Sequence, residues 1–126
     1  MGERFEDGMR VRRAVLGDAH VDRAEAAQTA FDEPFQTFIT EGAWGSVWAR
    51  EDLTPRDRSL ITLSLLAAGG HWDEVAMHIR ATAHTGATPG EVREALLHVA
   101  VYAGVPAANH ALKIAKATYA EMGVDP

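Results

Sequence analysis

The 126-residue sequence contains no cysteine, which excludes disulfide frameworks, thiolate zinc sites and thiol redox chemistry. No apolar run approaches the roughly 20 residues that a membrane helix needs. The formal net charge of −6 disfavours nucleic-acid binding, which normally requires a basic field. The N-terminal segment is too charged for a secretory signal. We therefore expect a cytoplasmic protein with neither a membrane nor a nucleic acid as partner.

Strand signals and common catalytic motifs are also missing. The sequence has no G-x-S-x-G element and no glycine-rich phosphate loop, so serine hydrolases and nucleotide-binding enzymes find no support. The composition, 47% hydrophobic and 24% charged, is that of a globular protein able to bury a core. Because no linker or low-complexity stretch divides the chain, we expect one domain spanning residues 1–126.

Helix signals are abundant instead. Thr54-Pro55 and Thr88-Pro89 each place a capping residue before a proline at the first helical position. Glycines follow the apolar patterns that these pairs begin. The sequence predicts an all-α domain of about six to seven helices. The expected helices span residues 3–15, 22–29, 32–45 (interrupted or ended near Gly42 and Gly45), 55–68, 71–86, 89–103 and 106–119, with a loop at 17–21.

A basic cluster lies in the first of these helices. Arg10, Arg12 and Arg13 follow three acidic residues within the same predicted helix. Charges of both signs on one helix are typical of a solvated face with ion pairs. We therefore expect this cluster to be exposed rather than to bind phosphate.

The segment from residue 71 to 86, HWDEVAMHIRATAHTG, carries the strongest candidate chemistry. At about 100° per residue, His71, Glu74 and His78 fall within about 60° of one another at the border of the apolar face. A carboxylate beside an imidazole can move its protonation into the physiological range, which suits proton transfer. A half-buried polar seam between helices or subunits explains the same pattern. Three ligands from one helix rarely surround an ion, so we expect no metal.

Arg58 is the second candidate. It lies one turn into the most apolar predicted helix, where a guanidinium needs a partner. That partner is either the carboxylate of a ligand or the carboxylate of Asp57 or Glu91, with which Arg58 would form an ion pair.

Aromatic residues supply further candidates. Trp44 and Trp48 are four positions apart and form either one wall of a site or a contact in the core or between subunits. Tyr102 lies near a predicted helix end, where its hydroxyl could reach a pocket or a backbone carbonyl.

Four segments together resemble the carboxymuconolactone decarboxylase family: RRAVLGDAHVDRA (12–24), AWGSVWAR (43–50), RDRSLITLSLLAA (56–68) and residues 78–116. The resemblance implies an alkylhydroperoxidase-D-like helical fold that assembles into trimers or hexamers. The superfamily's peroxidase branch carries C-x-x-C-x-x-x-H. Here His71 and Glu74 occupy the cysteine positions before His78, so thiol peroxidase activity is chemically impossible.

The resemblance also implies an activity: cofactor-independent decarboxylation of 4-carboxymuconolactone, a small dicarboxylate lactone, to 3-oxoadipate enol-lactone in protocatechuate catabolism. His78 would be the proton donor, Glu74 would tune it, and Arg58 would bind a substrate carboxylate. The further substrate-binding candidates are His20, Arg23, His71, Trp44 and Tyr102. An alternative is a non-catalytic helical oligomer that binds a small organic acid or a partner chain.

Overall fold

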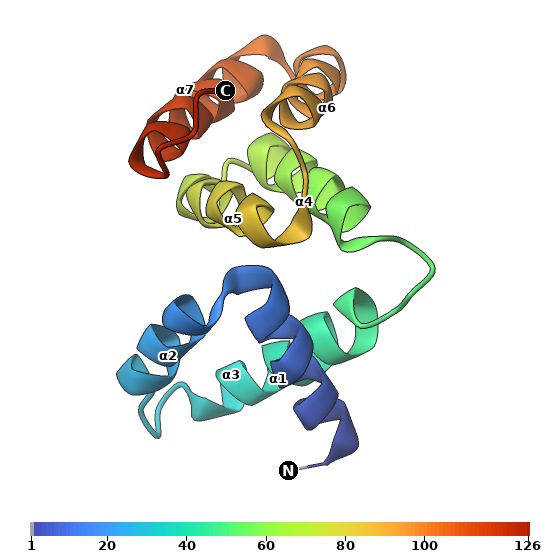
Figure 1. Cartoon of the computed structure of the whole chain (residues 1–126), viewed down its shortest axis with the longest axis vertical. Coiled ribbons are helices and arrows are strands. Elements are labelled where there is room, and N and C mark those ends of the chain that lie inside the picture. Colours follow the sequence, from blue (N-terminus) through green and yellow to red (C-terminus); the bar gives the residue numbers. More distant parts are fainter. Residues whose placement is uncertain (1) are drawn as a thin grey trace. The chain divides into compact units, whose positions relative to one another are not determined.

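The computed structural model describes residues 2–126, and within that range the chain forms seven α-helices, one π-helical segment and no strand (Figure 1). The prediction of an all-α fold is confirmed. The chain divides into two compact units, unit 1 up to Thr54 and unit 2 from Pro55 to Pro126. Each unit is described by itself.

Unit 2 follows the helix signals of the sequence closely. Its third helix begins at Pro89 after a complete capping box. The hydroxyl of Thr88 accepts a hydrogen bond from the Glu91 N–H (3.1 Å), and the Glu91 carboxylate accepts one from the Thr88 N–H (2.9 Å). Gly86 ends the preceding helix in the left-handed conformation, with φ of 86°. The four helices are α4 (Pro55–Gly69), α5 (Trp72–Thr85), α6 (Pro89–Tyr102) and α7 (Val105–Glu121).

Aliphatic side chains form the core of unit 2. Helix α4 contacts all three other helices of the unit, and Leu63, Ile79 and Leu96 are almost completely buried between them. Ala108, Ala111 and Ala115 of α7 also face inward, which allows close helix approach. Helix α4 is not buried all round, however: Ile61 is exposed and Leu65 is 67% exposed. Its outer face is therefore apolar but uncovered in the single chain.

Unit 1 departs from the sequence expectations at its first connection. The predicted loop over 17–21 is wrong, because only Gly17 (φ of 90°) separates α1 from α2. The Arg13 guanidinium lies 3.1 Å from Asp18, 2.9 Å from Asp22 and 3.3 Å from Glu25. These carboxylates lie on one face of α2 over two turns and join it to α1 through ion pairs, while Val21 of α2 is completely buried. The elements of unit 1 are α1 (Glu3–Leu16), α2 (Asp18–Ala27), α3 (Glu33–Ile39) and η1 (Thr40–Trp48).

In unit 1, glycines also allow two helices to approach each other closely. The predicted break near Gly42 and Gly45 is wrong, since the chain continues through both as the π-helical segment η1. A Cβ on Gly45 would collide with the backbone carbonyl of Arg4, and one on Gly8 would collide with that of Thr40. These two glycines therefore let the backbones of α1 and η1 touch. Gly42 has open space at its Cα.

The basic cluster of α1 is only partly exposed. Arg10 pairs with Asp7 at 2.8 Å on the surface, as expected. Arg12 contradicts the prediction, because it is only 6% exposed. It faces inward since α1 packs on both α2 and η1. Desolvation lowers the pKa of Arg12, and the nearby Glu25 carboxylate opposes this shift.

Candidate functional site

His78 is the buried titratable group of α5. Its side chain is 6% exposed and shares the inner face of the helix with Val75 and Ile79. Helix α5 packs on both α4 and α7, and Val75 and Ile79 belong to the core of unit 2. A buried imidazole is a candidate group for proton transfer.

The other two members of the predicted helix edge lie differently. Glu74 is exposed, one turn before His78. His71 precedes the helix as its N-cap residue, and its imidazole lies against Gly69, where a Cβ would come within 2.8 Å of the ring. Of the three residues predicted to share one edge of the helix, only Glu74 and His78 lie within α5, because the helix begins at Trp72 and not at His71.

Arg58 is half-buried in the first turn of α4. The adjacent Ser59 is fully buried, and its hydroxyl lies 2.7 Å from that of Thr85 at the end of α5. Arg56, two residues before Arg58, binds the Glu91 carboxylate at 3.0 Å.

Two of the proposed site residues thus lie on one packed helix pair. Arg58 belongs to α4 and His78 to α5, and the Ser59–Thr85 hydrogen bond fixes these helices to each other. The hydroxyl pair was missed from sequence because Ser59 resembles an ordinary polar position. A serine at the start of an otherwise apolar helix is the available signal.

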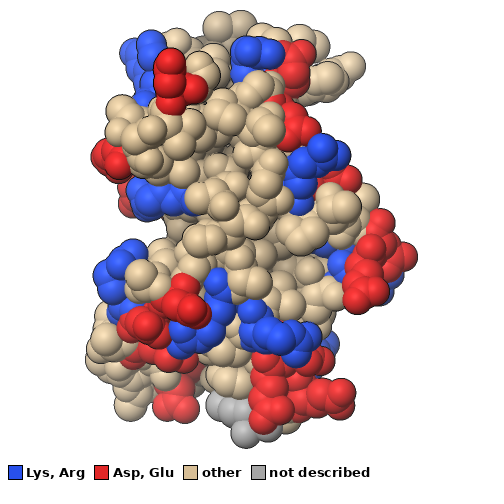
Figure 2. Space-filling view, viewed as in Figure 1, with Lys and Arg blue, Asp and Glu red and all other residues tan. Residues whose placement is uncertain are grey.

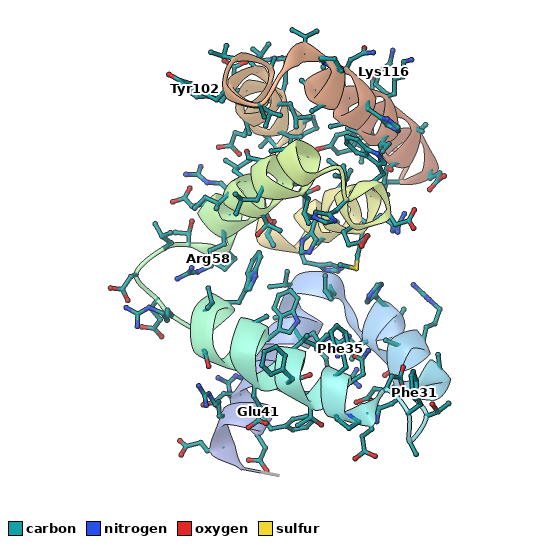
Figure 3. The ribbon with its side chains drawn as sticks, turned by 180° about the vertical axis from the view of Figure 1, so that it is seen from behind. Phe31, Phe35, Glu41, Arg58, Tyr102 and Lys116 are labelled. Atoms are coloured by element: carbon teal, nitrogen blue, oxygen red, sulfur yellow. The ribbon has the colours of Figure 1, made fainter. Side chains whose placement is uncertain are left out.

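Tyr102 is not brought to this pair within the chain. It is 84% exposed near the end of α6, where its ring lies 6.2 Å from that of His98. In Figure 3, Tyr102 and Arg58 lie at opposite ends of unit 2. A shared pocket would need Tyr102 from another copy of the chain.

Unit 1 holds the remaining candidates. His20 is half-buried and Arg23 exposed on α2, the helix that Arg13 holds in place. Trp44 is buried in η1 and its ring lies 5.1 Å from that of Trp48, at 36°. The aromatic pair predicted from the spacing is therefore present.

Metal-binding clusters and membrane-spanning helices were two further possibilities for the described residues. Across residues 2–126, no group of three or more histidine, aspartate or glutamate side chains is placed to hold a metal ion. In the same range no helix combines the length and apolarity required to span a membrane. Figure 2 shows acidic and basic side chains mixed over the visible face, which is unlike a nucleic-acid interface.

Comparison with known proteins gives consistent matches. Residues 33–117 match the carboxymuconolactone decarboxylase family. The chain is 41% identical to a 4-carboxymuconolactone decarboxylase of Acinetobacter baylyi over 98% of this chain and 92% of that protein. It is 42% identical to a nitrosuccinic acid decarboxylase of Metarhizium robertsii, covering 94% of this chain and 82% of that protein. A third relative, a 4-carboxymuconolactone decarboxylase of Pseudomonas putida, is 54% identical over 34% of this chain and 90% of its own length.

Proposed function

Because the chain belongs to the carboxymuconolactone decarboxylase family, we propose that it is a carboxy-lyase that converts 4-carboxymuconolactone to 3-oxoadipate enol-lactone in the β-ketoadipate pathway. The observation that carries the proposal is the 41% identity to a decarboxylase of that substrate along 98% of the chain. We expect this activity in the cytoplasm, which a cysteine-free sequence suits.

The proposed substrate explains why no cofactor is needed. When the bond to the γ-carboxylate breaks, CO2 leaves and its bonding electrons pass through the ring double bond to the lactone carbonyl oxygen. A dienolate results, and protonation of the carbon beside the carbonyl yields the enol-lactone. The substrate is therefore its own electron sink, a part that a cofactor plays in other decarboxylases.

The protein must then bind the carboxylates, stabilise the developing oxyanion and deliver one proton. We assign the proton delivery to His78, since its burial keeps bulk water from competing. We assign a substrate carboxylate to Arg58, whose guanidinium gives charge-assisted hydrogen bonds. Glu74, one turn before His78, would favour the protonated imidazole through its negative charge.

The five remaining candidates stay proposals as substrate contacts. His20, Arg23 and Trp44 would contribute from unit 1. His71 would act from the start of α5. Tyr102 would act in a neighbouring copy, because α6 holds it away from Arg58 in its own chain.

A second substrate is favoured by the relative from Metarhizium robertsii. Nitrosuccinic acid also carries an electron sink, its nitro group, so both named substrates suit one cofactor-independent mechanism. The chain is 41% and 42% identical to these two relatives, so identity alone does not choose between their substrates. Both relatives are named as decarboxylases. The assay must therefore compare CO2 release from the carboxylated lactone with CO2 release from the nitro acid.

The test is release of CO2 by the purified protein from each substrate in parallel, before and after exhaustive chelation. We expect turnover of 4-carboxymuconolactone that chelation leaves unchanged, and slower turnover of nitrosuccinate. Faster turnover of nitrosuccinate would reassign the substrate. Loss of activity on chelation with recovery on adding one metal would contradict the cofactor-independent mechanism. Binding without CO2 release would support the non-catalytic alternative.

We further propose that the protein is a homo-oligomer, a trimer or hexamer as in the family. Ile61 and Leu65 on α4 and Leu97 and Val101 on α6 leave apolar surface exposed on two helices that pack together, and such surface commonly marks an interface. Light scattering at micromolar concentration should give a multiple of 13.6 kDa. The variant Leu65→Glu should have a lower mass than the unaltered protein. A monomeric mass for the unaltered protein would contradict the proposal.

A further inference from the structure

Unit 2 contains a cavity between α6 and α7 that the proposed reaction does not use. Its volume is about 170 Å³. Val92, Leu112, Ala115 and the ring of Tyr119 form its apolar wall. None of the residues that line it is among those assigned above to proton delivery or substrate binding.

Two cations stand at this apolar wall. Arg93 on α6 and Lys116 on α7 both line the cavity, and the other lining residues, Pro89 and Pro126 among them, have no acidic side chain. This is the reverse of the whole chain, whose formal net charge is −6. Arg93 donates from Nε to the Glu94 carboxylate at 3.1 Å, which leaves its two terminal nitrogens as donors. Lys116 is exposed at the upper end of unit 2 in Figure 3.

We propose that this α6–α7 cavity binds a single-ring carboxylate. Its volume is close to that of apolar cavities of roughly 150 Å³ that accept benzene, so it has room for one six-membered ring. The apolar wall would contact the ring, while Arg93 and Lys116 would bind the carboxylate from two helices. A ligand with a ring but no charge would leave both cations unused.

The experiment is an NMR titration of the full chain with benzoate, and with benzamide as the neutral match. We expect saturable shifts at Leu112 and Ala115, with benzamide binding at least about tenfold more weakly. The double variant Arg93→Gln/Lys116→Gln should weaken benzoate binding about tenfold. Lys113→Gln removes a cation of α7 that does not line the cavity, and it should bind benzoate as the unaltered protein does.

Three results would overturn the proposal. Equal affinity for benzoate and benzamide would show that the cations take no part. An unchanged affinity in the double variant would show the same. Shifts confined to α4 and α5 would place benzoate at the proposed reaction site instead. Because the readout is binding and not turnover, failure here would leave the proposed decarboxylation untouched.

Discussion

The two units of the molecule hold their helices together in different ways. In unit 2, aliphatic side chains such as Leu63 and Ile79 separate the helices and fill the space between them. In unit 1, α1 and η1 meet backbone to backbone at Gly8 and Gly45, and a charged residue, Arg12, is buried beside them. Contact through side chains leaves a periodic hydrophobic pattern in the sequence, whereas contact through backbones leaves only glycines.

The largest expected effect tests whether the chemistry resides in unit 2. His78→Gln keeps size and polarity but removes a titrating group, so turnover should fall roughly 100- to 10,000-fold. His20→Gln in unit 1 should instead change KM more than turnover, since we propose His20 only as a substrate contact. Steady-state kinetics and thermal melts of both variants provide the comparison. Near-normal turnover in folded His78→Gln would pass the acid role to His71 or His20.

The next effect concerns substrate binding by α4. Arg58→Ala should raise KM about tenfold or more, because a hydrogen bond to a charged group contributes roughly 1.5–3 kcal/mol. Arg56→Ala is the matched control two residues earlier, where the loss is a surface pair with Glu91. It should leave KM unchanged. An equal rise of KM in both variants would mean that the start of α4 is merely being destabilised.

A third prediction tests the backbone contact in unit 1. Gly8→Ala places a methyl group on the Thr40 carbonyl, and overpacking of this kind costs roughly 1–3 kcal/mol of unfolding free energy. Gly42→Ala adds the same group where nothing lies within 4 Å and should not destabilise. Urea denaturation of both variants measures the difference. Equal stability would show that α1 and η1 separate easily.

The smallest effect is a pH dependence in unit 2. Burial raises the pKa of Tyr119, and neighbouring Thr82 lowers it by less. Above about pH 10 the unfolded chain therefore loses the phenol proton before the folded chain does, and stability falls as the pH rises. Tyr119→Phe should reduce this alkaline loss. Tyr102→Phe, at an exposed position, should not, and identical alkaline melts for all three proteins would contradict the shift.

The same contrast explains how far the sequence could be interpreted. The helix ends of unit 2 were predictable because Thr88, Pro89 and Gly86 act locally, through hydrogen bonds and backbone angles within one turn. The start of α2 was not, because Gly17 ends α1 as a glycine can, but the next helix begins directly after it and packs on α1 with Val21 completely buried. Gly45 was misjudged for a related reason: a glycine that ends a helix and one that admits a neighbour look alike in one sequence.

The candidate site divides in the same way. The contact between Trp44 and Trp48 could be predicted because it depends only on their spacing along one helix. The exposure of Tyr102 and the N-cap position of His71 depend on where each helix begins and how it packs. One residue of error in a helix start is enough to move a side chain off the predicted face.

The contact at Gly8 and Gly45 also has a genetic consequence. Every amino acid that a single base change can produce from a glycine codon carries a Cβ. Since a Cβ at either position would meet a backbone carbonyl, no missense mutation there is conservative. In a saturation library read out by growth on protocatechuate, a readout that rests on the proposed function, missense alleles at these two codons should therefore be depleted more strongly than those at the codon of Gly42, which lies in the same helical segment as Gly45.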